Sequence, residues 1–443
     1  MDILIRVLQL ILILSILVFV HESGHFLFAR LFKIKVEKFY LFFDTKFALF
    51  RYKPKNSDTE YGIGWIPLGG YCKIAGMVDE SMDKDSMSKP PQPWEFRSKP
   101  AWQRLLVLVG GVLFNFILAI IVYGCTLYTW GESYIRNDDA VYGIYAGRLA
   151  QQTGFRHGDR IIAFDGVPTT DFAQLQIDMV RSQAETATVI RDNDTVTVQI
   201  DKSLLPEMLN TPGMFSISIP FQIYSVPDTS INVAAGLMKG DILEQVDSLK
   251  LKGGLFEAKS YFASVKGQSV DAVFRRGQDT LHKTLQISPL GYAEVIPNGT
   301  ISDFIEITEK DYSLLQCMGA GAKKAATTLT NYIKELKLVA NPETEAYKSV
   351  GSFIRIGQIL PPMWNWMAFW NILAFLSVML AVLNILPIPA LDGGHIVFTL
   401  FEMITGKKPS DKVLEVAQII GMAILLGIMV LAFSNDIIML FNN

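Results

Sequence analysis

Two histidines and a glutamate near the start of the chain have the residue types and the spacing of a metal centre. His21, Glu22 and His25 form the motif H-E-x-x-H. Residues four apart lie on one face of a helix, so both imidazoles can bind one metal ion, most often zinc. The glutamate between them can act as general base on a water bound to that metal. The motif therefore predicts hydrolytic metal chemistry, with His21 and His25 as ligands and Glu22 as the catalytic base.

The motif interrupts a strongly apolar run. No charged residue occurs from Val7 to Val20, and apolar residues resume at Phe26. Ionisable side chains at membrane depth are costly unless they are paired, metal-bound or in a wet cavity, so they indicate a functional site. A chance match on the core helix of a soluble protein is the alternative, and the composition of the chain argues against it.

The composition is that of a membrane protein with soluble parts. Half of the 443 residues are hydrophobic, only 19% are charged, and the mean hydropathy is +0.29. The net charge of −3 gives no indication of a nucleic-acid partner. Cys72, Cys125 and Cys317 are scattered and form no C-x-x-C motif, so we expect neither a disulfide framework nor a zinc–thiolate site.

Four stretches are long and apolar enough to cross a bilayer, which takes about 20 residues. They are 3–31, which carries the motif, and the uncharged runs between Arg104 and Glu132, between Arg355 and Asp392, and between Glu415 and Asp436. A cleaved signal peptide is a poor alternative for the first stretch, because it lacks a strong basic start and a small-x-small cleavage site.

The distribution of Lys and Arg predicts the orientation. The connection between the first two stretches, 30–104, is rich in both, and the connection between the last two carries Lys407, Lys408 and Lys412. Such connections face the cytoplasm. Both termini and the long central segment are then expected outside, with the H-E-x-x-H motif near the cytoplasmic leaflet.

The central segment, 131–311, has soluble composition and contains one pattern twice. Residues 150–166 and 234–247 both read as small residues, then Gly-apolar-x-x-Gly-Asp, then a strand. This resembles the signature of PDZ domains, and further strands are expected at 186–200 and 270–287. PDZ modules bind extended peptides by adding them to a sheet edge. Peptide binding and simple steric exclusion of bulky substrates both stay open for the two modules.

A zinc site needs a third protein ligand, and the end of the third apolar stretch offers one. Residues 384–395 read N-I-L-P-I-P-A-L-D-G-G-H, and Pro387 and Pro389 cannot continue a helix. The backbone therefore opens just before Asp392, whose carboxylate is a candidate ligand. An N-cap of the following helix is the alternative role for this aspartate.

Together these residues resemble the site-2 protease family of intramembrane metalloproteases, closest to the bacterial regulator-of-sigma-E protease type. H-E-S-G-H matches the family's H-E-x-G-H, and 384–394 match its N-x-x-P-x-P-x-L-D-G-G pattern. The order of motif helix, second span, tandem PDZ insert and two further spans also agrees, so the resemblance covers nearly the whole chain.

The resemblance implies a set of site residues. His21, His25 and Asp392 would bind Zn²⁺ and Glu22 would be the general base, whereas His395 receives no ligand role. Relatives often carry Gly-Pro-x-x-Asn where this chain has G-V-L-F-N, so the role of Asn115 stays open.

The resemblance also implies residues that bind substrate. Asn384 would help to hold the substrate backbone. The stretch 59–77, which includes Gly69 and Gly70, would form a membrane-re-entrant β-hairpin whose free edge pairs with an unwound substrate helix. Irregular backbone at membrane depth is tolerated only inside protein. An ordinary cytoplasmic hairpin is the alternative.

The predicted fold is a polytopic α-helical membrane protein. It has four transmembrane helices, a membrane-re-entrant β-hairpin, and two PDZ-like α+β modules inserted between spans two and three. The predicted parts are 1–130, 131–215, 216–308, 309–355 and 356–443, namely a membrane core, two PDZ-like modules, a connecting segment and a second piece of core. The connecting segment contains an amphipathic stretch, 325–338, which lies either on the outer membrane surface or against the second module.

The predicted function is that of a zinc-dependent intramembrane endopeptidase in a bacterial inner (cytoplasmic) membrane, with its PDZ-like modules on the periplasmic side. The expected partners are the lipid bilayer and single-pass membrane proteins, such as a pre-trimmed anti-sigma factor or remnant signal peptides. We expect no nucleic acid and no small-molecule cofactor.

Two alternatives come from other classes. A metal transporter or sensor would need polar residues along the spans, and the second and fourth offer little beyond Asn115, Thr126 and Gln418. An inactive scaffold is disfavoured because Glu22 is intact.

Overall fold

The computed structural model describes residues 2–77 and 90–442. The chain divides into two compact units. The first comprises 1–131, 311–337 and 347–443, and the second comprises 132–310 and 338–346.

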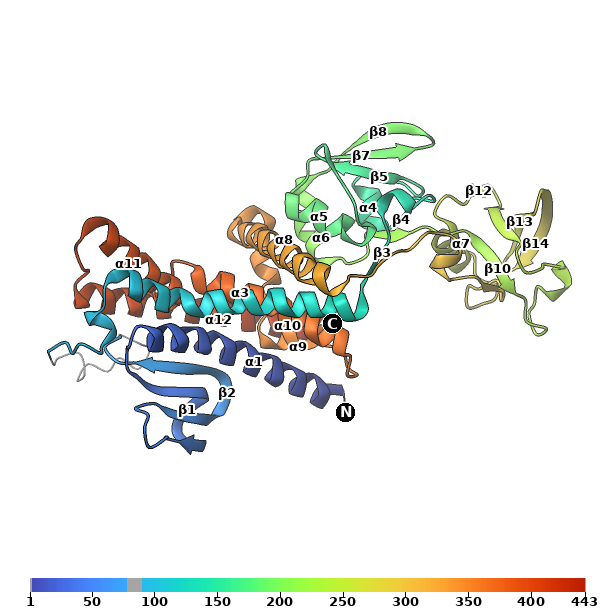
Figure 1. Ribbon diagram of the computed structural model, residues 1–443. Coiled ribbons are helices and arrows are strands. Elements are labelled where there is room, and N and C mark those ends of the chain that lie inside the picture. The colour runs from blue at the N-terminus through green and yellow to red at the C-terminus, as the bar shows by residue number, and fades with distance from the viewer. Residues whose placement is uncertain (1, 78–89, 443) are drawn as a thin grey trace. The chain divides into compact units, whose positions relative to one another are not determined.

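Four helices of the first unit are long and apolar enough to cross a membrane, and each coincides with a predicted stretch (Figure 1). They are α1 (Asp2–Leu31), α3 (Ala101–Trp130), α10 (Trp366–Ile385), and Lys412–Ile438 within α12 (Asp411–Asn442). The prediction of four apolar spans is confirmed in length and composition.

Small residues let α1 and α3 cross closely. A side chain added at Gly24 of α1 would collide with the backbone of Gly110 in α3. On the other side, α10 packs on α3, and the Ser377 hydroxyl donates to the backbone oxygen of Asn115 over 2.7 Å. A fully buried apolar cluster fills the space between the three helices, including Ile13, Ala119 and Leu373.

The chain turns sharply between α10 and α11 (Asp392–Thr405), as the two prolines predict. A side chain at Gly393 would collide with backbone oxygens at the end of α10, and one at Gly421 of α12 would meet Pro389 at about 2.5 Å. The residue that caps α11 is Leu391, without a side-chain hydrogen bond. Asp392 is therefore the first helical residue, and the alternative role as N-cap is wrong.

A bent sheet lies beside α1 (Figure 1). It consists of β1 (Val36–Tyr52) and β2 (Glu60–Ile74). Residues 38–41 of β1 have partners on two sides, since Leu41 is paired with both Gly70 and Ile63. The predicted hairpin within 59–77 is therefore wrong in its pairing: β2 occupies most of that stretch, and its partner is β1, a strand that was not predicted.

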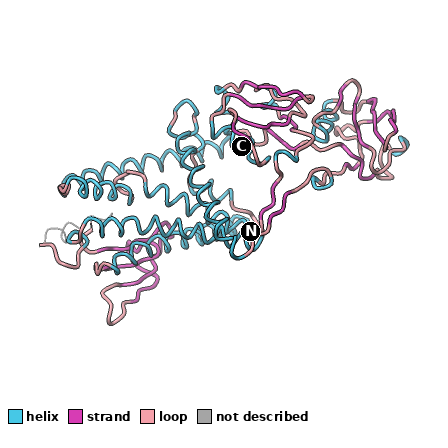
Figure 2. The backbone as a smooth tube through the Cα atoms, turned by 45° about the horizontal axis from the view of Figure 1, so that its top comes forward, coloured by secondary structure: helices cyan, strands magenta, loops and turns pink. Residues whose placement is uncertain are grey.

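The second unit contains two α+β modules, drawn with their strands in magenta in Figure 2. In the first, the strand order is β6-β5-β7-β8. Its elements are α4 (Arg148–Gln152), β5 (Arg160–Phe164), β6 (Val167–Pro168), α5 (Leu175–Ser182), β7 (Thr186–Arg191) and β8 (Asp194–Gln199).

The second module has the order β14-β13-β11-β10-β15, with β12 (Leu249–Lys250) paired to β11. Its other elements are β10 (Phe221–Ser225), β11 (Ile242–Val246), α7 (Gly254–Ser264), β13 (Ser269–Arg276), β14 (Asp279–Gln286) and β15 (Ile296–Pro297). A short pair formed by β4 (Ile144–Ala146) and β9 (Phe215–Ile217) flanks the first sheet in sequence, since β4 precedes β5 and β9 follows β8.

The repeated Gly-Asp of the sequence makes the same contact in both modules. The buried carboxylate of Asp159 accepts two hydrogen bonds from the Arg191 guanidinium, at 2.8 and 2.7 Å. Asp241 accepts two from Arg276, both at 2.7 Å. In each module a backbone N–H three residues before the aspartate also donates to it. The repeat therefore places equivalent, fully hydrogen-bonded carboxylates.

The main segment of the second unit, 132–310, begins and ends in one strand pair. The strand β3 (Glu132–Tyr134) pairs with β16 (Thr308–Lys310), so that Glu132 lies opposite Lys310. The helix α8 (Leu314–Ala340) follows and is longer than the predicted 325–338. A side chain at its Gly321 would collide with the Gly124 backbone at 2.5 Å, so α8 crosses α3 closely. The short helix α9 (Phe353–Ile359) then leads to α10.

Candidate metal centre

The three predicted ligands converge at one point. His21 and His25 come from α1 and Asp392 from the first turn of α11. The Nε2 atoms of His21 and His25 lie 3.2 and 3.3 Å from Asp392 Oδ2, and 3.2 Å from each other. They form one potential metal cluster among the residues that the structure describes. The sharp turn before α11 is what brings the carboxylate to the histidines.

The spacing of these three atoms fits zinc. A tetrahedral zinc ion with bonds of about 2.0–2.1 Å holds its ligand atoms about 3.3 Å apart. The observed separations of 3.2–3.3 Å match that edge. Four-coordinate zinc needs only three protein ligands when the fourth position holds water.

The protonation pattern around His25 supports a cation between the three atoms. Its Nδ1 lies 2.8 Å from the Val107 backbone oxygen, which can only accept, so Nδ1 carries the hydrogen. A metal-bound ring is neutral, so its Nε2 would then present the lone pair to the metal beside Asp392. The buried Oδ2 of Asp392 accordingly receives no hydrogen bond from the described residues. Facing lone pairs repel one another unless a cation lies between them.

Glycine makes room for the two imidazoles. A side chain at Gly111 of α3 would lie 2.5 Å from both Cε1 of His21 and Nε2 of His25. The same helix presents Gly110 to Gly24, the glycine inside the H-E-S-G-H motif. The close crossing of α1 and α3 therefore packs both imidazole rings directly against the backbone of α3.

The other predicted site residues surround this cluster. Asn384, near the end of α10, places Nδ2 3.3 Å from His21 Nε2. Glu22 is half-buried on α1, and no described residue donates a hydrogen bond to its carboxylate. A side chain at Gly70 of β2 would lie 2.7 Å from Val18, one turn before His21. Gly69 precedes it with φ +157°, at the bend of the strand.

Three residues of α3 at this site were not assigned a role from the sequence: Val107, Gly111 and Asn115. Asn115 Nδ2 lies 3.1 Å from His21 Nδ1. Its signal was available, since it is a lone amide within an uncharged span, and polar groups at that depth indicate function. The backbone oxygen of Val107 carries no signal in sequence.

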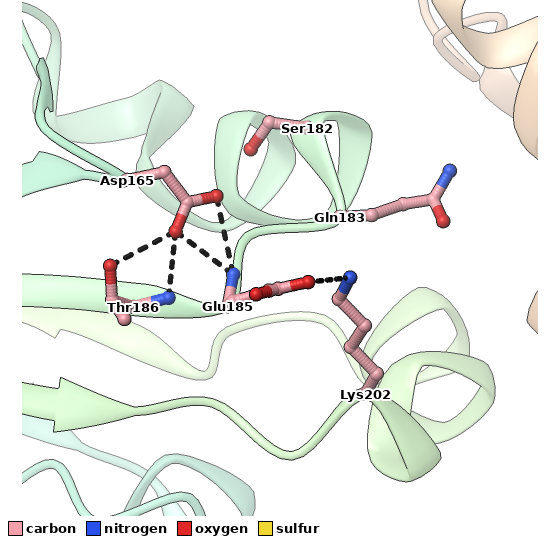
Figure 3. A pocket seen from close by; sticks show the side chains of 6 residues that line it. All are labelled: Asp165, Ser182, Gln183, Glu185, Thr186 and Lys202. Carbon is pink, nitrogen blue, oxygen red and sulfur yellow. Dashed lines mark hydrogen bonds and ion pairs between the residues drawn. The ribbon is translucent and has the colours of Figure 1, made fainter.

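His395 is not part of the cluster among the described residues. It lines a separate cavity of about 260 Å³ beside the buried Arg104–Glu402 ion pair. A second, open hollow in the first module surrounds Asp165 (Figure 3). There the Asp165 carboxylate accepts from Thr186 and from the backbone of Glu185, and Lys202 pairs with Glu185, so these groups satisfy one another.

The fold and the cluster define a membrane protein with a potential metal site, and the comparisons with known proteins specify its class. A model of "Peptidase family M50" matches residues 9–428. The chain is 28% identical to a protein of Xylella fastidiosa (strain Temecula1) named "Putative zinc metalloprotease", over 99% of both chains.

Other relatives agree. A "Putative zinc metalloprotease" of Clostridium perfringens is 27% identical over 97% of both chains. A "Regulator of sigma E protease" of Haemophilus influenzae is also 27% identical, over 97% of this chain and 98% of the relative.

The chain belongs to peptidase family M50, the site-2 protease family, as the motifs predicted. It is a zinc metalloprotease, and Zn²⁺ is its metal cofactor. The family and the four apolar helices indicate a bacterial membrane protein.

Proposed function

We propose that this protein hydrolyses a peptide bond within or near the transmembrane segment of single-pass membrane proteins. The observation that carries the proposal is the convergence of His21, His25 and Asp392 between helices apolar enough to cross a bilayer. A hydrolytic centre at that depth has access to substrate segments that soluble proteases do not reach.

The proposed ligands are His21, His25 and Asp392. When bound, zinc lowers the pKa of a water ligand toward about 7 and polarises the scissile carbonyl. The first-turn position of Asp392 suits a ligand, because the partial positive charge at the start of α11 favours a carboxylate there.

Glu22 is the proposed general base. It takes a proton from the attacking water and then returns it to the leaving amine, so one carboxylate serves both steps. Because no described residue donates a hydrogen bond to it, its oxygens are available to a water.

Asn384 and the β1–β2 sheet are the proposed substrate-binding elements. A helical peptide bond is shielded and internally hydrogen-bonded, so the substrate must unwind before attack. An extended segment can then pair with a free strand edge, and Gly69 and Gly70 lie where the sheet meets α1. The Asn384 amide can hold a substrate backbone group beside the cluster. We propose that this sheet is membrane-re-entrant.

The two α+β modules are proposed to be PDZ-like and periplasmic, in an inner membrane where the Lys/Arg-rich connections face the cytoplasm. Their shared Asp–Arg contacts agree with tandem copies of one module. The proposed substrates are pre-trimmed anti-sigma-factor-like proteins or remnant signal peptides, and the name of the Haemophilus influenzae relative supports the first kind.

The position of the cut tests this function. The purified protein, reconstituted in liposomes with a tagged single-pass substrate, should produce fragments whose new ends, mapped by mass spectrometry, lie within the apolar segment. Cutting confined to the soluble flanks of the substrate would contradict intramembrane proteolysis. A substrate with a scrambled apolar segment of the same composition controls for local sequence.

A further inference from the structure

Asn115 carries a buried side-chain amide that has no role in the proposed hydrolysis. Its side chain is fully buried in the middle of α3. Nδ2 lies 3.1 Å from Nδ1 of His21, and Oδ1 has no hydrogen-bond partner among the described residues. A buried amide oxygen without a hydrogen-bond partner is destabilising, so this arrangement calls for a physical reason.

The orientation of the amide decides the tautomer of His21. If Nδ2 donates to Nδ1, the ring hydrogen must lie on Nε2, the atom that faces His25 and Asp392 at 3.2 Å. That tautomer has no lone pair for a metal. A half-turn of the amide instead places Oδ1 against Nδ1, where it accepts the N–H. The half-turn gives the buried oxygen a partner, moves Nδ2 to the place that Oδ1 leaves, and keeps the lone pair of Nε2 facing the cluster.

The helix α3 also provides a hydrogen-bond acceptor for Nδ1 of His25. The Val107 backbone oxygen accepts from Nδ1 of His25, and Gly111 leaves room for both rings. Val107, Gly111 and Asn115 are spaced four apart, so they form one face of α3. The Ser377 hydroxyl, on α10, donates to the backbone oxygen of Asn115 and not to its side chain.

We propose that Asn115 is a positioning residue that accepts a hydrogen bond from Nδ1 of His21 and so holds this imidazole in the tautomer that binds zinc through Nε2. This inference rests on the proposed ligand role of His21. Groups that orient a metal-binding histidine typically contribute about 10- to 100-fold to metal affinity. Asn115 would thereby accept from Nδ1 of His21, just as the Val107 backbone oxygen accepts from Nδ1 of His25.

The test compares the zinc affinity of the full-length protein, purified in detergent, by competition with a chromogenic chelator. Asn115→Leu removes the acceptor at similar volume and should weaken zinc binding about 10- to 100-fold. Asn115→Asp keeps an acceptor at the same place and should stay within about threefold of wild type or bind more tightly. Ser377→Ala, the matched control, removes only the bond to the Asn115 backbone and should leave the affinity unchanged.

The absorption spectrum of the Co²⁺-substituted protein is the second readout. Asn115→Asp should keep the intense visible bands of a tetrahedral site, whereas Asn115→Leu should lose intensity. If Asn115 only packs, a buried carboxylate should be the more disruptive change, and Asn115→Asp should be the weaker binder. That result, or wild-type affinity of Asn115→Leu, would overturn the inference. If Asn115→Leu does not fold, the Asn115→Asp affinity and spectrum still decide.

His21→Ala separates this inference from the proposed function. Zinc binding by His21→Ala with wild-type affinity would refute the ligand assignment itself. Loss of zinc in His21→Ala together with wild-type binding by Asn115→Leu would refute only the role of Asn115.

Discussion

Gly111 tests the packing around the imidazoles at the scale of one residue. Replacing it with alanine would place Cβ 2.5 Å from both His21 and His25, and the opposing α1 backbone leaves little room to retreat. We expect Gly111→Ala to weaken zinc binding by at least about tenfold, as displaced ligands do. Gly427→Ala, a helical glycine of α12 with open space around it, is the control and should bind zinc normally. Chelator competition measures both, and equal affinities would show that the rings tolerate the added methyl group.

The spacing of H-E-x-x-H was sufficient to predict that His21 and His25 share one metal site, whereas Asp392 was assigned as the third ligand through the resemblance of its L-D-G-G motif to the family pattern. The contacts of Val107, Gly111 and Asn115 could not be predicted in the same way. They depend on which face of α3 meets α1, and that register is set by the Gly24–Gly110 crossing. In the sequence, G-V-L-F-N differs from the pattern of relatives by a missing proline. The contact of the Asn115 amide with His21 becomes evident only in the structure.

At the scale of elements, the buried ion pair of the second module gives a pH-dependent prediction. Two hydrogen bonds from Arg276 hold the pKa of Asp241 below its ordinary value, against the opposing effect of burial. The folded state therefore favours the charged form, and this stabilisation is complete above the ordinary pKa of about 3.9. It is lost as the pH falls from there through the lower pKa of the folded state.

Asp241→Asn should accordingly destabilise β13 and β14 near pH 7 by about 1–3 kcal/mol, because one charge-assisted acceptor is lost. Hydrogen exchange of the amides of these strands in the full chain measures the effect. The difference between variant and wild type should shrink below about pH 4. A difference that persists unchanged to pH 2 would mean that the ion pair is not its source. Thr280→Ser, an exposed and uncharged change in β14, is the control.

The elements themselves were predictable to different degrees. The four spans were evident because three are uncharged runs of sufficient length and the first is a long apolar run interrupted by the H-E-x-x-H motif. The partner of β2 was not, because β1 mixes charged residues such as Glu37 and Lys38 with a run of aromatic residues and lacks regular alternation. The pairing of β1 with β2 is a tertiary contact, in which residues 38–41 of β1 pair with two different parts of β2.

At the scale of the molecule, residues 132–310, which carry both modules, can be deleted without leaving a long gap between Gly131 and Asp311. Glu132 and Lys310 lie opposite each other in the β3–β16 pair, so Gly131 and Asp311 can be joined by a short Gly-Ser linker. If the two modules exclude bulky substrates, the protein that lacks them should cut a substrate that still carries its folded outer domain. The intact protein should cut only the trimmed form of that substrate. Gel comparison of both substrates with both proteins, at equal zinc content, measures this.

The same comparison separates gating from recruitment. If the modules recruit substrate by pairing it to a sheet edge, the deletion should slow cleavage of the trimmed form as well. Loss of cleavage of both substrates by a zinc-loaded deletion protein would contradict gating and favour recruitment.

The central claim, that α1 and α11 together build a hydrolytic zinc centre, is tested most directly by Glu22→Gln. This change leaves His21, His25 and Asp392 in place and removes only the base. We expect one zinc per chain, as in wild type, and a loss of cleavage of at least about 100-fold, at the lower end of what a general base contributes. Zinc content by mass spectrometry and cleavage in liposomes are to be measured on the same preparation. Substantial cleavage by the zinc-loaded variant would contradict the assignment of Glu22 and with it the proposed chemistry.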